Sequence, residues 1–202
     1  MMHIALGAQF DRGKTALHRA VLEGDCADVE DALTVTMDIN AVDELHRTAL
    51  LLAVEREALD IVTLLLKKGA DPNLATYSGL TPLHIAAYAG HLAMAKALLR
   101  CAADVDCLNA AGLTPLHNAV MGGHLPIVKL LLQHGAGVNR PAHDGRTPLH
   151  GAVALRNSQI VRYLLDHGAD LQMRDERGLT PRALAEQVGD QALAKRLGAA
   201  GG

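Results

Sequence analysis

The hexapeptide Gly79-Leu80-Thr81-Pro82-Leu83-His84 decides the fold, because it returns as Gly112-Leu113-Thr114-Pro115-Leu116-His117 and, with one change, as Gly145-Arg146-Thr147-Pro148-Leu149-His150. The threonines of the three copies follow one another at a constant interval. The same step in both directions reaches three further threonines, Thr15, Thr48 and Thr180. Six threonines in one register, with no insertion between them, indicate an internal repeat with a period of 33.

Each repeat contains the signals of two short helices. Thr81 is a good N-cap and Pro82 a good first residue, since the missing proline N–H would be unpaired at that position. A first helix is predicted over 83–89, Gly90 ends it, and a second helix is predicted over about 92–100. Because two short helices cannot bury their own apolar faces, the pairs are expected to stack into an elongated solenoid. Glycines follow the second helix where a left-handed closing residue is expected, at Gly69, Gly135 and Gly168.

The pattern Gly79-x-Thr81-Pro82-Leu83-His84-x-Ala86-Ala87-x-x-Gly90-His91, followed by Leu98-Leu99, resembles the ankyrin repeat. The resemblance covers residues 8 to about 198, so we expect a single ankyrin-repeat domain over residues 1–202. It implies an all-α solenoid of stacked helix-turn-helix units with short β-hairpin loops, whose concave face is the docking surface for other proteins. The expected repeats, 1 to 6, are about 11–43, 44–76, 77–109, 110–142, 143–175 and 176–198.

Several repeats lack a glycine at a position where the other repeats turn. His46 replaces the hairpin glycine of repeat 2 and Glu57 its inter-helix glycine, while Thr36 and Ala102 replace the closing glycines of repeats 1 and 3. A non-glycine residue at positive φ costs roughly 1 kcal/mol or more. Repeats 1 and 2 are therefore predicted to be locally the least stable part of the chain. The charged helices of repeat 6 predict a polar C-terminal cap, and residues 198–202 a frayed tail.

The composition agrees with packed helices. The 202 residues are 50% hydrophobic but only 2% aromatic, so the core must come from Leu, Ala, Val and Ile. The 19 Lys and Arg against 22 Asp and Glu give a net charge of −3, which disfavours a phosphate backbone as partner. The three scattered cysteines form no framework, the N-terminus lacks the basic leader of a signal peptide, and no apolar run approaches the roughly 20 residues of a membrane span. We expect a cytoplasmic monomer that binds neither nucleic acid nor membranes, and leave open secretion by a signal-independent route.

No residue pattern predicts catalysis, a cofactor or a metal. Gly13-Lys14-Thr15 resembles the end of a phosphate-binding loop, but Ala8 stands where its first glycine is required. Histidines such as His84 and His117 recur at equivalent positions, roughly 8–10 Å apart in stacked helices, whereas zinc-ligating atoms lie only some 3–4 Å apart. These imidazoles are expected to hydrogen-bond across turns and fix the first helices. No serine elbow and no paired carboxylates are present, so we expect a protein that is not an enzyme, with an unrecognised site as the open alternative.

Function is expected to lie in side chains that the scaffold does not need. By analogy with the family, five positions in each repeat point to the concave face; they are charged in repeats 1 and 2 and largely apolar in repeats 3 to 5. Tyrosine and methionine favour the cores of interfaces, and charged residues favour their rims. The predicted protein-binding residues are Arg47, Tyr77, Leu80, Tyr88, Leu113, Met121, His143, Arg146 and Leu155.

We therefore predict a non-catalytic protein-protein interaction module, an adaptor, inhibitor or assembly factor, with an apolar anchor on repeats 3 to 5. One alternative is a bacterial effector or regulatory protein that binds a host or cognate enzyme. Another is a passive structural spacer, which the absence of any partner that depends on the apolar stripe would favour. The alternative for the stripe itself is that its side chains pack between repeats.

Overall fold

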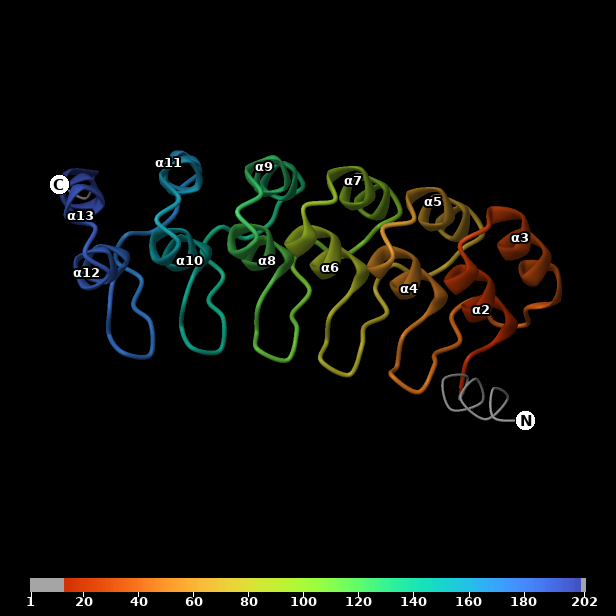
Figure 1. The fold of residues 1–202 in the computed structure, drawn as a ribbon. Coiled ribbons are helices and arrows are strands. Elements are labelled where there is room, and N and C mark those ends of the chain that lie inside the picture. The colour runs from red at the N-terminus through yellow and green to blue at the C-terminus, as the bar shows by residue number, and fades with distance from the viewer. Residues whose placement is uncertain (1–12, 201–202) are drawn as a thin grey trace, which may run out of the picture.

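A computed structural model describes residues 13–200 of the chain, and these residues form twelve helices joined in consecutive pairs (Figure 1). The first helices of the pairs are α2 (Ala16–Glu23), α4 (Ala49–Glu55), α6 (Pro82–Ala89), α8 (Pro115–Met121), α10 (Pro148–Ala154) and α12 (Pro181–Gln187). The second helices are α3 (Cys26–Val35), α5 (Leu59–Lys67), α7 (Leu92–Arg100), α9 (Leu125–Gln133), α11 (Ser158–Asp166) and α13 (Gln191–Ala200). The predicted all-α solenoid of stacked helix pairs is confirmed.

The helices lie in two rows, with the loops between repeats projecting from the row of first helices (Figure 1). These loops reverse the chain tightly. Before α6, the N–H of Thr76 donates to the carbonyl of Leu80 at 3.0 Å. The loops are shaped like hairpins, but in the described part of the chain only Val42 and Thr48 form a β-bridge, an isolated antiparallel one. Within residues 13–200, no helix combines the length and apolar character needed to cross a bilayer.

Each first helix begins at one of the registered threonines. The Oγ1 of Thr81 accepts the N–H of His84, and the ring Nδ1 of His84 accepts the N–H of Thr81. This reciprocal capping box is present in α2, α6, α8 and α10. A threonine N-cap is worth about 1 kcal/mol to a helix that is too short to be stable alone. The Thr-Pro-Leu-His sequence therefore fixes where α6, α8 and α10 start, without help from distant residues.

The same histidines also join neighbouring repeats. The Nε2 of His84 lies 2.9 Å from the carbonyl of Leu113, and His117 reaches the carbonyl of Arg146 at 3.1 Å in the same way. Because Nδ1 accepts a backbone N–H, Nε2 carries the proton of the neutral ring and donates it across the repeat boundary. Burial lowers the pKa of His84, His117 and His150, despite the hydrogen bonds to carbonyls that favour the charged ring. The structural role expected of these histidines is confirmed.

The core lies between the two rows of helices and consists almost wholly of aliphatic side chains. In repeats 1 to 5 the leucine two positions after the threonine is at most 1% exposed, as in Leu17, Leu50, Leu83, Leu116 and Leu149. Small side chains such as Ala86 and Ala119 at 0% exposure let successive first helices approach closely. The stack therefore has one continuous core that runs from Leu17 in α2 to Leu197 in α13.

The prediction for the turns that lack the family's glycine is confirmed only in part. His46, Glu57 and Ala102 adopt the left-handed conformation, with φ of 57°, 60° and 62°. The expectation for Thr36 is wrong, because its φ is −78° and the chain leaves α3 in an extended conformation. Arg156, with φ of 54°, is a further strained turn that the sequence analysis did not identify.

The ends of the domain are described only in part. The helix α13 continues to Ala200, so a non-helical tail beginning at residue 198 is wrong. Its Leu193, Ala194 and Leu197 are buried against the rest of repeat 6, which holds the helix in place. The N-terminal boundary at residue 11 and the final residues 201–202 lie outside the described residues.

Candidate protein-binding groove

A groove of about 510 Å³ lies between the hairpin loops and first helices of repeats 4 and 5. Its walls come from the C-terminal ends of α6, α8 and α10 and from the loops that precede α8 and α10. Six of the nine sequence-predicted residues line it, namely Tyr88, Leu113, Met121, His143, Arg146 and Leu155. The fold thus brings together side chains that lie far apart in the sequence, on three successive repeats.

The groove opens here because α10 carries unusually small side chains. Gly151 stands where α6 has Ile85 and α8 has Asn118, and Ala154 stands where α6 has Tyr88. The backbone of Gly151 has ordinary helical geometry, and a Cβ added to it would lie 3.4 Å from Val120 Cγ1. The conformation of α10 therefore does not require a glycine. Its absent side chain forms the floor of the groove.

The walls of the groove are large apolar side chains that remain half in solvent. Tyr88 is 56% exposed, Met121 49% and Leu155 52%. These fractions are far above the 0–1% of the leucines that pack between repeats. Large apolar side chains gathered around one concavity are typical of a site that is covered when a partner binds.

Arg146 and His143 form the polar end of the groove. The Nε of Arg146 lies 3.7 Å from an oxygen of both Asp144 and Asp175, which is beyond hydrogen-bond distance. The ring of His143 stands over Gly112, where any side chain would collide with it. The guanidinium of Arg146 is thus held near two carboxylates without being saturated by either.

Asp175 explains why Arg146 stays in this place. Burial alone would raise the pKa of Asp175, but backbone N–H groups of Leu179 and Arg177, with nearby positive charge, hold the pKa below its usual value. Its Oδ2 is buried and has no hydrogen-bond partner in the described part of the chain. A charged carboxylate in this position attracts the nearest cation, which is the guanidinium of Arg146.

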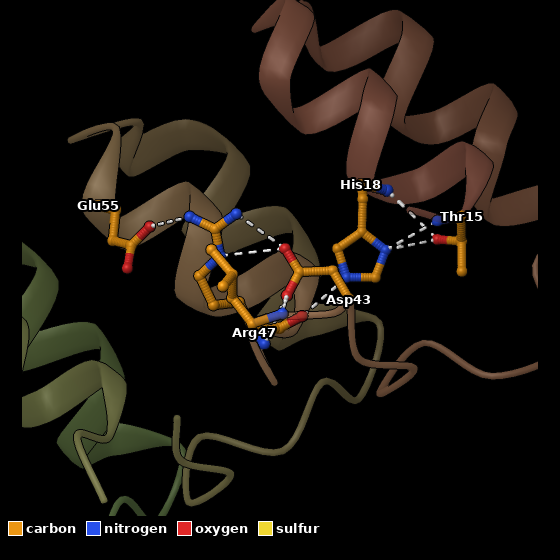
Figure 2. A network of polar contacts seen from close by, with 6 residues as sticks. Thr15, His18, Asp43, Arg47 and Glu55 are labelled. Carbon is orange, nitrogen blue, oxygen red and sulfur yellow. Dashed lines mark hydrogen bonds and ion pairs between the residues drawn. The ribbon is translucent and has the colours of Figure 1, made fainter. Parts of the chain in front are cut away.

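Arg47 occupies the same repeat position as Arg146 but is bound differently (Figure 2). Its Nε and Nη2 donate to Oδ2 of Asp43 at 3.0 and 2.8 Å, and its Nη1 donates to Glu55 at 3.2 Å. Burial raises the pKa of Asp43, yet the bonds from Arg47 outweigh it and keep that pKa below its ordinary value. His18 of repeat 1 contacts the carbonyl of Arg47 at 2.9 Å, so this network also joins two repeats.

The two remaining predicted residues lie outside the groove. Tyr77 is 76% exposed on the loop before α6, where its ring centroid is 4.8 Å from that of His46. Leu80 is half-buried in the same loop. The sequence analysis placed Ala154 on the concave face but did not predict it as a binding residue, and it missed Gly151. Aligning the six repeats would have exposed both as small residues at positions otherwise occupied by larger ones.

The residues considered for other chemistry have structural roles. Thr15 is the N-cap of α2, and Gly13 is the left-handed residue of the turn before it. The Sγ of Cys107 lies 3.4 Å from Thr81 Oγ1 and 3.6 Å from His84 Nδ1. Burial raises the pKa of Cys107, which favours the thiol over the nucleophilic thiolate. In the described residues, no three His, Cys, Asp or Glu side chains converge as a metal site.

The family description "Ankyrin repeats (3 copies)" matches the chain twice, over residues 17–109 and 83–175. Together the matches cover well over half of the 202 residues, and the chain belongs to the ankyrin-repeat family. Repeats of this family generally act as protein-protein interaction modules and are typically non-catalytic.

Similar proteins come from distant organisms. The chain is 42% identical over 85 residues to the B-cell lymphoma 3 protein homolog of Mus musculus, covering 42% of this chain and 19% of that protein. It is 39% identical over 85 residues to the nuclear factor NF-kappa-B p105 subunit of Gallus gallus, covering 41% of this chain and 9% of that protein. An ankyrin repeat protein of Rickettsia bellii is 36% identical over 90 residues, covering 44% of this chain and 50% of that protein. The chain thus spans half or less of each of these relatives.

Proposed function

We propose that this chain is a non-catalytic module that binds a protein partner in the groove of repeats 4 and 5. The apolar anchor consists of Tyr88, Met121 and Leu155, together with Leu113 from the loop that precedes α8. His143 and Arg146 contact the polar part of the same partner segment. The observation that carries the proposal is the groove itself, whose three large apolar wall residues are each about half exposed.

The size and chemistry of the groove fit a segment of protein. A volume of about 510 Å³ lies within the roughly 300–1,000 Å³ of clefts that bury a drug-sized ligand, a size comparable to a few side chains of a partner. Burying one large apolar side chain from the partner contributes about 1.5–3 kcal/mol. Tyrosine and methionine at the centre of such a contact are residue types enriched in the cores of interfaces, and tyrosine is among those that dominate binding energy.

Arg47, Tyr77 and Leu80 have different places in this proposal. Tyr77 and Leu80 form the edge of the surface on repeat 3, beside the anchor residue Tyr88. Arg47 we assign to holding the loop of repeat 2, because Nε and both Nη nitrogens already bond to Asp43 and Glu55. An adaptor, an inhibitor, and an effector that acts by binding an enzyme would each use the groove in this way.

The proposal is tested by affinity capture from a lysate of the source organism with a variant in which Tyr88, Met121 and Leu155 are changed to Ala. A matched control changes three other exposed apolar residues, Met37, Leu45 and Leu108, to Ala. Circular dichroism first establishes that both variants are folded. A protein held by the wild type and the control but lost from the groove variant supports the proposal. Retention by the groove variant, or equal loss from the control, contradicts it.

A further inference from the structure

Positive charge is concentrated on the second helices of repeats 2 to 6, α5, α7, α9, α11 and α13, which we define, with the C-cap Lys68, as the outer row. The second helix of repeat 1, α3, is not included, because it carries Asp28, Glu30 and Asp31 and no basic residue. The outer row contains eight of the nineteen Lys and Arg residues but only two of the twenty-two acidic residues, Asp60 and Asp166. The outer row therefore carries +6, while the remainder of the chain carries −9. The eight cationic residues are Lys67, Lys68, Lys96, Arg100, Lys129, Arg162, Lys195 and Arg196.

Four of these cations form a ladder along the outer row. Lys96, Lys129, Arg162 and Lys195 occupy the same position in repeats 3 to 6, where repeats 1 and 2 have Glu30 and Thr63. All four are exposed, and equivalent positions of adjacent packed helices lie about 8–10 Å apart. The second helices follow one another in a continuous row (Figure 1).

The ladder is poorly neutralised by the protein itself. Its one carboxylate neighbour within 4 Å among residues 13–199 is Asp166, 3.8 Å from Arg162, and both of these side chains are more than 60% exposed. Lys129 instead places its Nζ 5.3 Å from the ring centroid of Tyr163 on the next helix. An exposed row of positive charge in a chain of net negative charge is complementary to an acidic ligand.

Two grooves in the outer row combine positive charge with an apolar floor. Between α5 and α7, Lys67 and Arg100 flank a groove of about 250 Å³ that is also lined by Leu66 and Ala97. Between α11 and α13, a groove of about 410 Å³ is lined by aliphatic side chains, by Arg162 and Arg196, and by one acidic residue, Asp166. A ligand that contacts both the cationic side chains and the apolar floors of these grooves must carry negative groups with apolar groups between them.

We propose that the outer row binds an extended acidic segment of a partner protein, in which a carboxylate recurs about every third residue and apolar side chains lie between. In the polyproline II conformation an extended chain has three residues per turn and advances about 3.1 Å per residue, so every third side chain faces the ladder at a spacing of about 9 Å, which matches that of its cations. The apolar side chains enter the grooves between the outer helices. This site is separate from the groove of repeats 4 and 5 and does not depend on the function proposed for it.

The same surface fits a membrane or a nucleic acid less well. Of the large apolar side chains exposed in the described residues, only Leu59, at 37%, belongs to the outer row, so the row has little to insert into a bilayer. Its one aromatic residue, Tyr163, is half-buried and lies next to Lys129, so it offers no open stacking surface for bases.

The test uses a fluorescent peptide of about 15 residues that repeats Glu-Leu-Ser, with its binding followed by anisotropy at about 0.05 M salt. One variant changes Lys96, Lys129, Arg162 and Lys195 to Gln, which preserves helix propensity. The charge-matched control changes four exposed cations elsewhere, Arg56, Arg140, Arg174 and Arg177, to Gln. A second peptide has the same composition with its glutamates in one block.

The ladder variant is expected to bind the spaced peptide at least about tenfold more weakly than the wild type, and the control variant within about twofold. The wild type is expected to prefer the spaced peptide to the block peptide. Equal losses in the two variants, or no binding of the spaced peptide, would overturn the proposal. Tighter, ladder-dependent binding of phosphatidylserine vesicles or of a DNA duplex would also overturn it, in favour of a membrane or nucleic-acid surface.

Discussion

Repeats 2 and 4 form equivalent pairs of helices with different turn residues and different helix-capping contacts. Repeat 4 has glycine at each of its left-handed turns, and His117 caps α8 and bonds to the next repeat. Repeat 2 places His46 and Glu57 in left-handed turns and has Leu51 where the histidine belongs. The difference teaches that repeat 2 folds through packing, since the residues of α4 from Ala49 to Val54 are each at most 2% exposed.

Repeat 2 compensates in part with polar contacts of its own. The Asp43, Arg47 and Glu55 network ties its loop to α4, and the Nδ1 of His46 lies 2.9 Å from the carbonyl of Ala75 in the following loop. These contacts do not remove the strain of two non-glycine residues at positive φ. We therefore still predict that the N-terminal repeats open at a lower free energy than repeats 4 and 5.

The largest effect is expected from removing a core leucine of repeat 4. Leu116→Ala deletes a side chain that is 0% exposed and should lower the free energy of unfolding by about 2–5 kcal/mol in urea denaturation. Tyr88→Ala, at 56% exposure, should leave the midpoint of unfolding nearly unchanged. If both substitutions destabilise equally, Tyr88 belongs to the core, and the groove does not present it to a partner.

Exchanging the residues found at the position of the bridging histidine, His117 in repeat 4 and Leu51 in repeat 2, should give the next largest effect. His117→Leu gives repeat 4 the residue that repeat 2 has, and leaves the N–H of Thr114 without its side-chain acceptor. We expect a loss of about 1–3 kcal/mol at pH 8, measured by urea denaturation. Leu51→His should install the missing bridge to the carbonyl of Leu80, and a stability at pH 8 below that of the wild type would show that packing of Leu51 matters more.

The same exchange predicts a change in pH dependence. Burial lowers the pKa of His84, His117 and His150 in the folded chain, so between the folded value and about 6.5 the unfolded chain binds more protons. Stability from these three histidines is therefore fully present above about pH 6.5 and is lost as the pH falls below it. Denaturation between about pH 5 and pH 8 should show a shallower decline in His117→Leu than in the wild type. A slope that His117→Leu leaves unchanged would assign the decline to other groups.

A smaller and reciprocal pair of effects should come from the turns. Glu57→Gly relieves a left-handed glutamate and should stabilise the chain by about 1 kcal/mol, whereas Gly123→Ala at the equivalent turn of repeat 4 should destabilise it by a similar amount. A Cβ at Gly123 meets nothing closer than 3.8 Å, so its effect isolates the backbone. Thermal unfolding that moves in the same direction for both variants would remove strain as the reason for the weakness of repeat 2.

Much of the fold was predictable because its signals are local. Thr81 and Pro82 start a helix through contacts with their immediate sequence neighbours, so the regular recurrence of the motif predicted the first helices directly. Thr36 was misjudged because a missing glycine does not reveal whether the chain still turns there. The groove could not be predicted without the fold, because Gly151 contributes to it by having no side chain. The pairing of Arg47 with Glu55 could not be predicted either, because it depends on the distance between two side chains in the folded chain.

The smallest expected effect decides why α10 contains a glycine that α6 and α8 lack. Gly151→Ala should stabilise the chain by about 0.5–1 kcal/mol, because alanine is the better helix former and its Cβ would lie 3.4 Å from Val120 Cγ1, at the edge of ordinary contact. Gly151→Leu adopts the residue found at the same position of α4 and α12, and its side chain should fill the groove and abolish capture of the partner. Stabilisation by alanine together with loss of capture by leucine would mean that the glycine serves binding at the expense of the helix. Destabilisation by alanine would mean that Val120 leaves no room for a Cβ, and the glycine would then belong to packing.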